Sequence, residues 1–162
     1  MTKQYIHQFR TMEDLREIIK EFQGFVARPT VGENHPTLYD PENTPPGEKL
    51  VQGLRVKDWY LSPDYQWVLP HPQMGLSFSS NWQHLKGLHK MMQKHNPSTA
   101  VHVYWVLEAA DIPPGLKFVP DKKKKGHHFL TVTDKMLVHQ LVEKLNWIAD
   151  RMSVIKDAGF TL

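Results

Sequence analysis

The stretch TAVHVYWVLEA, residues 99–109, constrains the fold more than any other part of the sequence. It is rich in β-branched and aromatic residues, which favour extended backbone. It is the strongest strand pattern in the chain. We therefore expect this strand to lie in the middle of a sheet. Helical spacing before and after it predicts an α+β protein.

Shorter patterns predict the other elements. Thr11 with Asp14, and Ser80 with Gln83, have the spacing of capped helix starts. Apolar residues then recur with helical period after each pair and again near the end of the chain. The expected helices are 12–27, 82–95 and 134–155, and the other expected strands are 3–9, 66–70, 74–79 and 127–133.

Residues 28–53 contain five prolines and keep no regular period. Proline lacks a backbone donor and disfavours helix in the residue before it, so the pattern predicts a loop. A loop of this length is uncommon unless it binds something or is disordered. We expect Leu38 and Tyr39 to pack partly onto the core.

Composition excludes several classes of protein. The 162 residues fit one domain, 1–162, and contain no cysteine, which excludes a disulfide scaffold and a thiolate zinc site and suits a reducing cytosol. No leader-like or membrane-spanning apolar run occurs, so no membrane partner is expected. The net charge of +3 owes much to the lysine run 122–125. We interpret this run as a solvated loop tip, with contact to phosphate or to an acidic partner as the alternative.

The familiar motifs of several enzyme classes are missing. His84 and His89 are separated by roughly 140° around a helix, so they are poorly placed to share an ion, and no HExxH occurs. We expect no metal site. The chain also lacks the P-loop, the Rossmann glycine turn and the GxSxG elbow of serine hydrolases.

The strand GLSFSS, residues 75–80, carries the clearest functional pattern. Side chains alternate along a strand, so Ser77 and Ser79 share one face while Leu76 and Phe78 anchor the other in the core. The helix that follows begins with free N–H groups, which suit an anion. The alternative is a purely structural role, in which the serines end a strand and cap a helix.

Arg10 ends the first strand and His128 lies in the late strand. We expect these two residues to converge with the serines on one cavity.

Four segments together resemble a known family. They are HPTLYDPENTPPG (35–47), GLSFSS (75–80), ADIPPGLKF (110–118) and HHFLTVT (127–133). They are similar to the small type VI secretion effector toxins of the Tse toxin number two family, over about residues 5–142. The resemblance implies an ADP-ribosyltransferase-like fold, with two small, mostly antiparallel sheets that form a cleft flanked by helices.

The resemblance also implies roles for individual residues. Arg10 would contact the phosphates or ribose of NAD, the expected cofactor. Ser77 and Ser79 would hold the ribose on the nicotinamide side, and Ser77 with His128 would be catalytic. Tyr104 would pack near the rings of the cofactor.

Phe129 is a second residue expected to pack near the rings. The resemblance is incomplete at the late strand, because HHFLTVT lacks the glutamate that many related enzymes place there. Glu108 and Asp134 are the two acids that could replace it.

The function that the resemblance implies is that of an antibacterial toxin with NAD-dependent ADP-ribosyltransferase activity or a related NAD-consuming activity. It would be held in the producer's cytoplasm by a cognate immunity protein. The type VI apparatus would then deliver it to the cytoplasm of a target cell, where it acts on an unknown macromolecular acceptor. Two alternatives stay open: an RNA-binding or RNA-modifying protein, and a non-catalytic interaction domain with the same fold.

Overall fold

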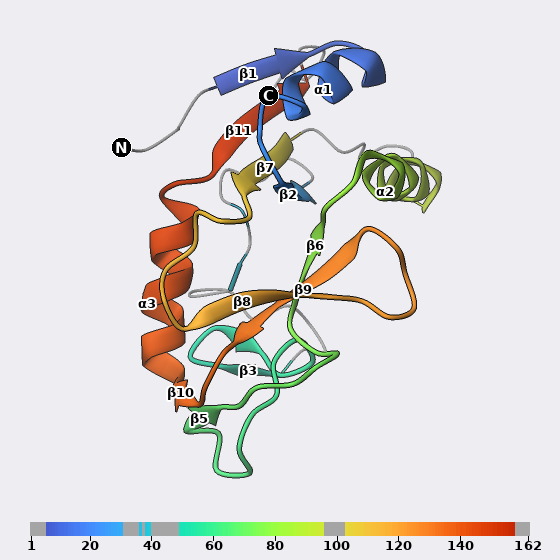
Figure 1. The fold of residues 1–162 in the computed structure, drawn as a ribbon. Helices are drawn as coiled ribbons and strands as arrows, with labels where there is room; N and C mark the ends of the chain where they lie inside the picture. The colour runs from blue at the N-terminus through green and yellow to red at the C-terminus, as the bar shows by residue number, and fades with distance from the viewer. Residues whose placement is uncertain (1–5, 31–35, 37, 40–48, 96–102, 158–162) are drawn as a thin grey trace.

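The computed structural model describes residues 6–30, 36, 38–39, 49–95 and 103–157 (Figure 1). Helices and strands are mixed along this part of the chain, so the predicted α+β class is confirmed. The elements are β1 (Ile6–Phe9), α1 (Met12–Ile19), β2 (Phe25–Thr30), β3 (Leu50–Val51), β4 (Leu54–Arg55), β5 (Trp67–Val68), β6 (Leu76–Ser79), α2 (Trp82–His95), β7 (Val103–Glu108), β8 (Leu116–Pro120), β9 (His127–Val132), β10 (Met136–Leu137), α3 (Val138–Ala149) and β11 (Ser153–Asp157).

Seven strands form the main sheet, in the order β1-β11-β7-β2-β6-β9-β8. β1 runs parallel to β11, and the other pairs are antiparallel. β7 lies between β11 and β2, which confirms the predicted interior strand. The described strands do not form the two small sheets that we expected: beside the large sheet lie the two-stranded pairs β3–β4 and β5–β10. The large sheet is narrowest between β2 and β6, which are joined only by the pair Ala27–Ser79.

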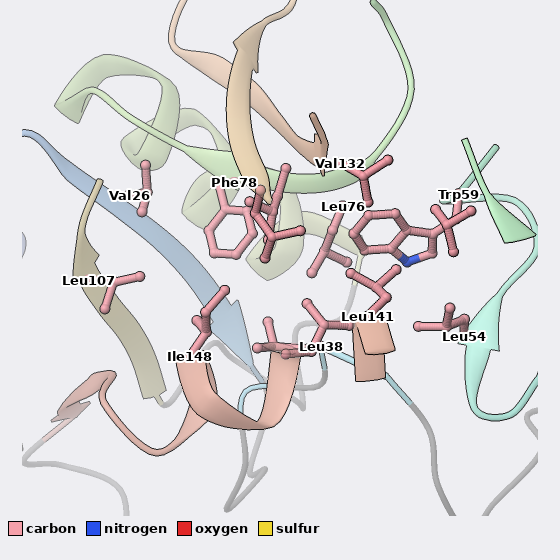
Figure 2. Close-up of a cluster of buried hydrophobic side chains, with 14 of the residues drawn as sticks. Val26, Leu38, Leu54, Trp59, Leu76, Phe78, Leu107, Val132, Leu141 and Ile148 are labelled. Atoms are coloured by element: carbon pink, nitrogen blue, oxygen red, sulfur yellow. The ribbon is translucent and has the colours of Figure 1, made fainter. Parts of the chain in front are cut away.

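The sheet separates two hydrophobic clusters. Helix α3 packs on one face through Leu141, Leu145 and Ile148 (Figure 2). The segment between β2 and β5, which includes β4, adds Leu38, Leu54 and Trp59 to that cluster. Helices α1 and α2 lie on the opposite face, where their residues pack against Tyr104 and Val106 of β7. The result is three layers, with α3 on one side of the sheet and α1 and α2 on the other.

The predicted helix 12–27 is wrong in its second half. Its start is confirmed, because Thr11 and Asp14 form the predicted capping box. The helix ends at Ile19, and the chain turns at Gly24, whose φ of +60° suits glycine. The next residues form β2, in which Val26 and Ala27 are buried. Two short elements joined by a glycine turn thus replace one long helix.

Two further boundaries differ from the prediction. The closing helix stops at Ala149 instead of continuing to 155, and residues 153–157 form β11 between β1 and β7. The segment between β7 and β9, in which the sequence predicted no strand, contains β8. At the start of α2 the capping residue is Asn81 instead of Ser80: its Oδ1 accepts from the backbone N–H of His84 at 2.8 Å.

The proline-rich segment is described only in part. Leu38 is 4% exposed, and the Tyr39 hydroxyl donates to Asn146 Oδ1 at 2.6 Å, so the expected packing of both residues is confirmed. Pro29 belongs to β2, so the regular structure reaches further than predicted. Residues 31–35, 37 and 40–48 lie outside the described part of the chain. No helix in the described part is long and apolar enough to cross a membrane.

Candidate functional site

Strand β6 alternates as the sequence predicted. Leu76 and Phe78 are buried in the cluster on the α3 face, at 1% and 2% exposure. Ser77 and Ser79 point to the other face, toward α2, and both line one cavity. Ser77 is exposed whereas Ser79 is 1% exposed, so only the first hydroxyl is freely presented to solvent.

The cavity lies beside the single pair that joins β2 to β6, and its volume is about 290 Å³. This value is close to the lower limit of about 300 Å³ for small-molecule sites. Five elements contribute to its wall: β2, β6, α2, the turn between β8 and β9, and the start of β9. The lining residues are Ala27, Arg28, Pro29, Ser77, Phe78, Ser79, His84, Leu88, Lys124 and His127.

Arg28 is the arginine that accompanies the serines. Its Nη1 donates to the carbonyl of Ser77 at 2.6 Å, and its Nε donates to the carbonyl of Pro36 at 3.3 Å. Its guanidinium carbon lies 5.5 Å from the centre of the Phe78 ring, within cation–π range. Burial lowers the pKa of Arg28 to about 10, so the group stays cationic at neutral pH. Arg28 thus borders the cavity, but its guanidinium is held by backbone carbonyls and packs on the Phe78 ring, on the opposite face of the sheet from the Ser77 hydroxyl.

Two histidines face each other across the cavity, with ring centres 5.5 Å apart. His84 comes from the first turn of α2, and its Nδ1 lies 2.7 Å from Ser79 Oγ. His127 opens β9, and its Nδ1 lies 2.9 Å from Asp121 Oδ2. A carboxylate only accepts, so Nδ1 of His127 carries the proton and neutral His127 has an accepting Nε2. This ring can orient a hydroxyl or take up a proton.

The lysine run forms the exposed tip of the β8–β9 hairpin. The tip is anchored, because Gly126 accepts from the backbone and side chain of Ser80 at 2.7 and 3.0 Å, and Lys122 N–H donates to Gln73 at 2.8 Å. The expectation of a loop tip is thus confirmed. Lys124 also lines the cavity and brings a positive charge to it.

The expected convergence of Arg10, Ser77 and His128 is not found. Arg10 is exposed at the end of β1 and lines a different cavity, together with residues of α1 and of the other side of α2. His128 pairs with Phe78 and not with a serine, so it lies on the opposite face of the sheet from Ser77. Its Nδ1 lies 2.7 Å from Ser80 Oγ. Arg28 and His127 line the serine cavity, where Arg10 and His128 were expected.

Tyr104 and Phe129, the two expected packing residues, have different positions. Tyr104 is 0% exposed in the core under α1 and α2 and is hydrogen-bonded to His89, so it does not line the serine cavity. Phe129 contacts the edge of the His127 ring, with ring centres 4.8 Å apart. It therefore supports a wall of the cavity from behind.

The two acids proposed to replace the missing glutamate lie elsewhere. Glu108 accepts from the backbone N–H of Gln23 at 2.8 Å, and Asp134 is exposed beyond β9. Among the described residues, none that lines the serine cavity is acidic. The nearest carboxylate in the hydrogen-bond network is that of Asp121, which acts through His127. The described residues also contain no group of three or more His, Asp or Glu that could hold a metal ion.

The histidines predict an acid sensitivity of folding. Burial lowers the pKa of His84, His89 and His128; His127 lowers it further for His84 and His128. As pH falls below about 6.5, the ordinary histidine value, the unfolded chain binds protons that the folded chain does not. The stability contributed by these groups is complete above that pH and is lost as pH falls through the folded values. We expect the urea concentration at the unfolding midpoint to decrease as the pH is lowered from about 7.5 to about 5.5.

The control for this pH effect is His139, an exposed histidine on α3. Replacing His84, His89 and His128 together by glutamine should flatten the dependence of the urea midpoint on pH. His139→Gln should leave that dependence unchanged. A slope of equal size in the triple variant would show that other groups cause the acid sensitivity.

Comparison with known proteins adds no relative: no family model, no curated protein and no solved structure matches the chain. The interpretation of the cavity therefore depends on its own residues and on the resemblance of the four sequence segments.

Proposed function

We propose that the serine cavity binds the nicotinamide half of NAD and that the protein is an ADP-ribosyltransferase-like enzyme. The observation that carries the proposal is the meeting of Arg28, Ser77, Ser79 and His127 at one cavity. Lys124 supplies positive charge for a phosphate, Ser77 presents a free hydroxyl to a ribose, and Arg28 holds the carbonyl of Ser77 in place. A volume of about 290 Å³ suits one half of a dinucleotide, with the other half extending from the mouth.

The reaction would break the bond between nicotinamide and C1′ of the ribose. The bonding electron pair leaves with nicotinamide, a lone pair of the acceptor forms the new bond to C1′, and the acceptor loses a proton. His127 is the group we assign to receive that proton through Nε2, because Asp121 fixes its tautomer and stabilises the charged ring. Ser77 would hold the ribose while positive charge develops on it.

The biological role belongs to the same proposal. Because of its resemblance to type VI secretion effectors, we propose that the protein is a toxin delivered into the cytoplasm of competing bacteria. A cognate immunity protein would hold it inactive in the producer. The ADP-ribosyltransferase-like fold is part of this proposal, and the narrow β2–β6 junction beside the cavity supports it.

Calorimetry with NAD tests the cavity directly. We expect Ser77→Ala to weaken binding about tenfold, because one hydrogen bond contributes on the order of 1 kcal/mol. Lys124→Gln should weaken NAD binding more at low salt than at high salt, because salt screens the interaction of an exposed charge. Ser77 and Lys124 are exposed, so neither change should disturb folding.

Thr133→Ala, which removes an exposed hydroxyl outside the cavity, is the matched control and should bind NAD as the wild type does. If NAD does not bind the wild type, or if it binds Ser77→Ala and Lys124→Gln as tightly as it binds the wild type, the proposed cofactor is wrong. His127→Gln separates binding from chemistry. It should retain NAD affinity while NAD consumption in a bacterial lysate falls at least a hundredfold, which is the lower end of general-base contributions.

A further inference from the structure

A second cavity, of about 290 Å³, lies on the other side of helix α2. It is bounded by the corner between β1 and α1, by α2, and by the end of β11. Residues two positions apart on a helix are rotated by about 200°, so Lys86 and Lys90 point away from the side where His84 and Leu88 line the first cavity. The lining residues are Phe9, Arg10, Thr11, Met12, Lys86, His89, Lys90 and Asp157.

Positive charge dominates this second cavity. Arg10, Lys86 and Lys90 give +3 and Asp157 gives −1, so the net charge is +2. Among the described residues, no ion pair or hydrogen bond engages the side chains of Arg10, Lys86 and Lys90. Uncompensated cations around one hollow repel each other, and an anion would remove that repulsion. Helix α2 itself contains no acidic residue.

His89 provides an independent sign of a ligand. Its side chain lines the cavity although the residue is only 7% exposed. Tyr104 is 0% exposed, and His89 is its only hydrogen-bond partner among the described residues, so we assign the hydroxyl as the donor and Nδ1 of His89 as the acceptor. The neutral ring then carries its proton on Nε2. This N–H has no partner among the described residues, so it is a buried donor that lacks an acceptor.

We propose that the second cavity binds a backbone phosphate of a single-stranded nucleic acid. Arg10, Lys86 and Lys90 would neutralise the phosphate charge, and Nε2–H of His89 would donate to one of its oxygens. A strand that continues past α2 would reach the lysine-rich tip of the β8–β9 hairpin, where Lys124 borders the first cavity. The exposed lysines of this tip would contact further phosphates of the strand.

Nucleic acid fits these features better than an acidic protein does. The cations lie around the second cavity and at the hairpin tip on the other side of α2, so they are spaced along a path that a phosphate backbone can follow. If the first cavity binds NAD, the strand is placed to supply the acceptor. This last step depends on the proposed function, whereas binding of the strand does not.

Fluorescence anisotropy with a labelled twelve-nucleotide oligouridine tests the proposal. The test variant combines Arg10→Gln, Lys86→Gln and Lys90→Gln. Removing three phosphate contacts should lower affinity at least tenfold at low salt and reduce the slope of log K against log salt by about 2. The control variant, Lys20→Gln with Lys117→Gln and Lys135→Gln, removes the same charge at residues that line neither cavity and should bind like the wild type. Lys86→Arg with Lys90→Arg should retain binding if the glutamine variant proves unstable.

Three competitors identify the source of the anion. Unlabelled oligouridine should displace the probe, whereas inorganic pyrophosphate and polyglutamate should do so only at much higher concentrations. Displacement by pyrophosphate or polyglutamate as readily as by oligouridine would overturn the assignment to nucleic acid. So would equal affinities of the test and control variants. An NAD titration of the same test variant should be unchanged, so failure of either proposal can be recognised separately.

Discussion

Replacing Phe78 by alanine is expected to lower the free energy of unfolding by about 3–5 kcal/mol. The ring is 2% exposed within the cluster under α3. It meets the edge of Phe118 with ring centres 5.2 Å apart, and it lies beneath the Arg28 guanidinium. Its loss leaves a cavity and removes a cation–π partner. Urea unfolding followed by tryptophan fluorescence measures the change.

Two substitutions control this result. Phe78→Leu keeps most of the volume and should cost much less than the alanine change. Phe129→Ala removes the same ring from the neighbouring strand, where the side chain is half-buried on the α2 face, and should also cost less. If Phe78→Ala lowered the free energy of unfolding by less than about 1 kcal/mol, the side chain of Phe78 would not point into the core.

The alternation of β6 was predictable from sequence because it depends on local geometry alone. A period of two requires no knowledge of the neighbouring strands, so the opposite directions of Ser77 and Phe78 follow directly from their spacing. The same holds for the capping box at Thr11, which involves residues three positions apart. The interior strand β7 was also predictable, because a run with two apolar faces needs cover on both sides.

The partners of β6 were not predictable in this way. Arg28 reaches Ser77 across 49 positions, and the sequence interpretation had placed its segment after a long helix. In the structure the chain turns at Gly24, so residues 25–30 form a strand. The sequence alone could not show this, because a single glycine in an amphipathic pattern is compatible with both a helix and a turn. The arginine of the cavity was therefore missed, and Arg10 was chosen instead.

The choice between the two adjacent histidines depends on strand register. His127 pairs with Ser79 and His128 with Phe78, so a shift of one residue would exchange their faces. The register is fixed at the tip of the hairpin, where the backbone N–H of Ser80 donates to the carbonyl of Gly126. No sequence pattern predicts this hydrogen bond. Long-range pairing thus decides which imidazole faces the serines.

Replacing Gly75 by alanine should be the most damaging single-methyl change in the described part of β6 and its flanks. A Cβ at this position would lie 2.3 Å from the carbonyl oxygen of Leu130 and 2.9 Å from its carbon. Both atoms belong to the backbone of β9, so relief of the clash requires the β6–β9 ladder to separate. Overpacking usually costs 1–3 kcal/mol, and we expect about 3 kcal/mol or more here because no flexible side chain can yield.

Gly87→Ala is the matched control for Gly75→Ala, because the same methyl group is added in α2, where it meets nothing within 4 Å. Alanine favours a helix over glycine by about 0.8–1.0 kcal/mol, so this variant should be more stable than the wild type. Urea midpoints of the two variants should therefore move in opposite directions. The Gly75 variant should also lose NAD binding, because separation of β6 from β9 pulls Ser77 and Ser79 away from His127. Equal stability of the two variants would show that β6 and β9 do not approach as closely at Gly75 as their pairing requires.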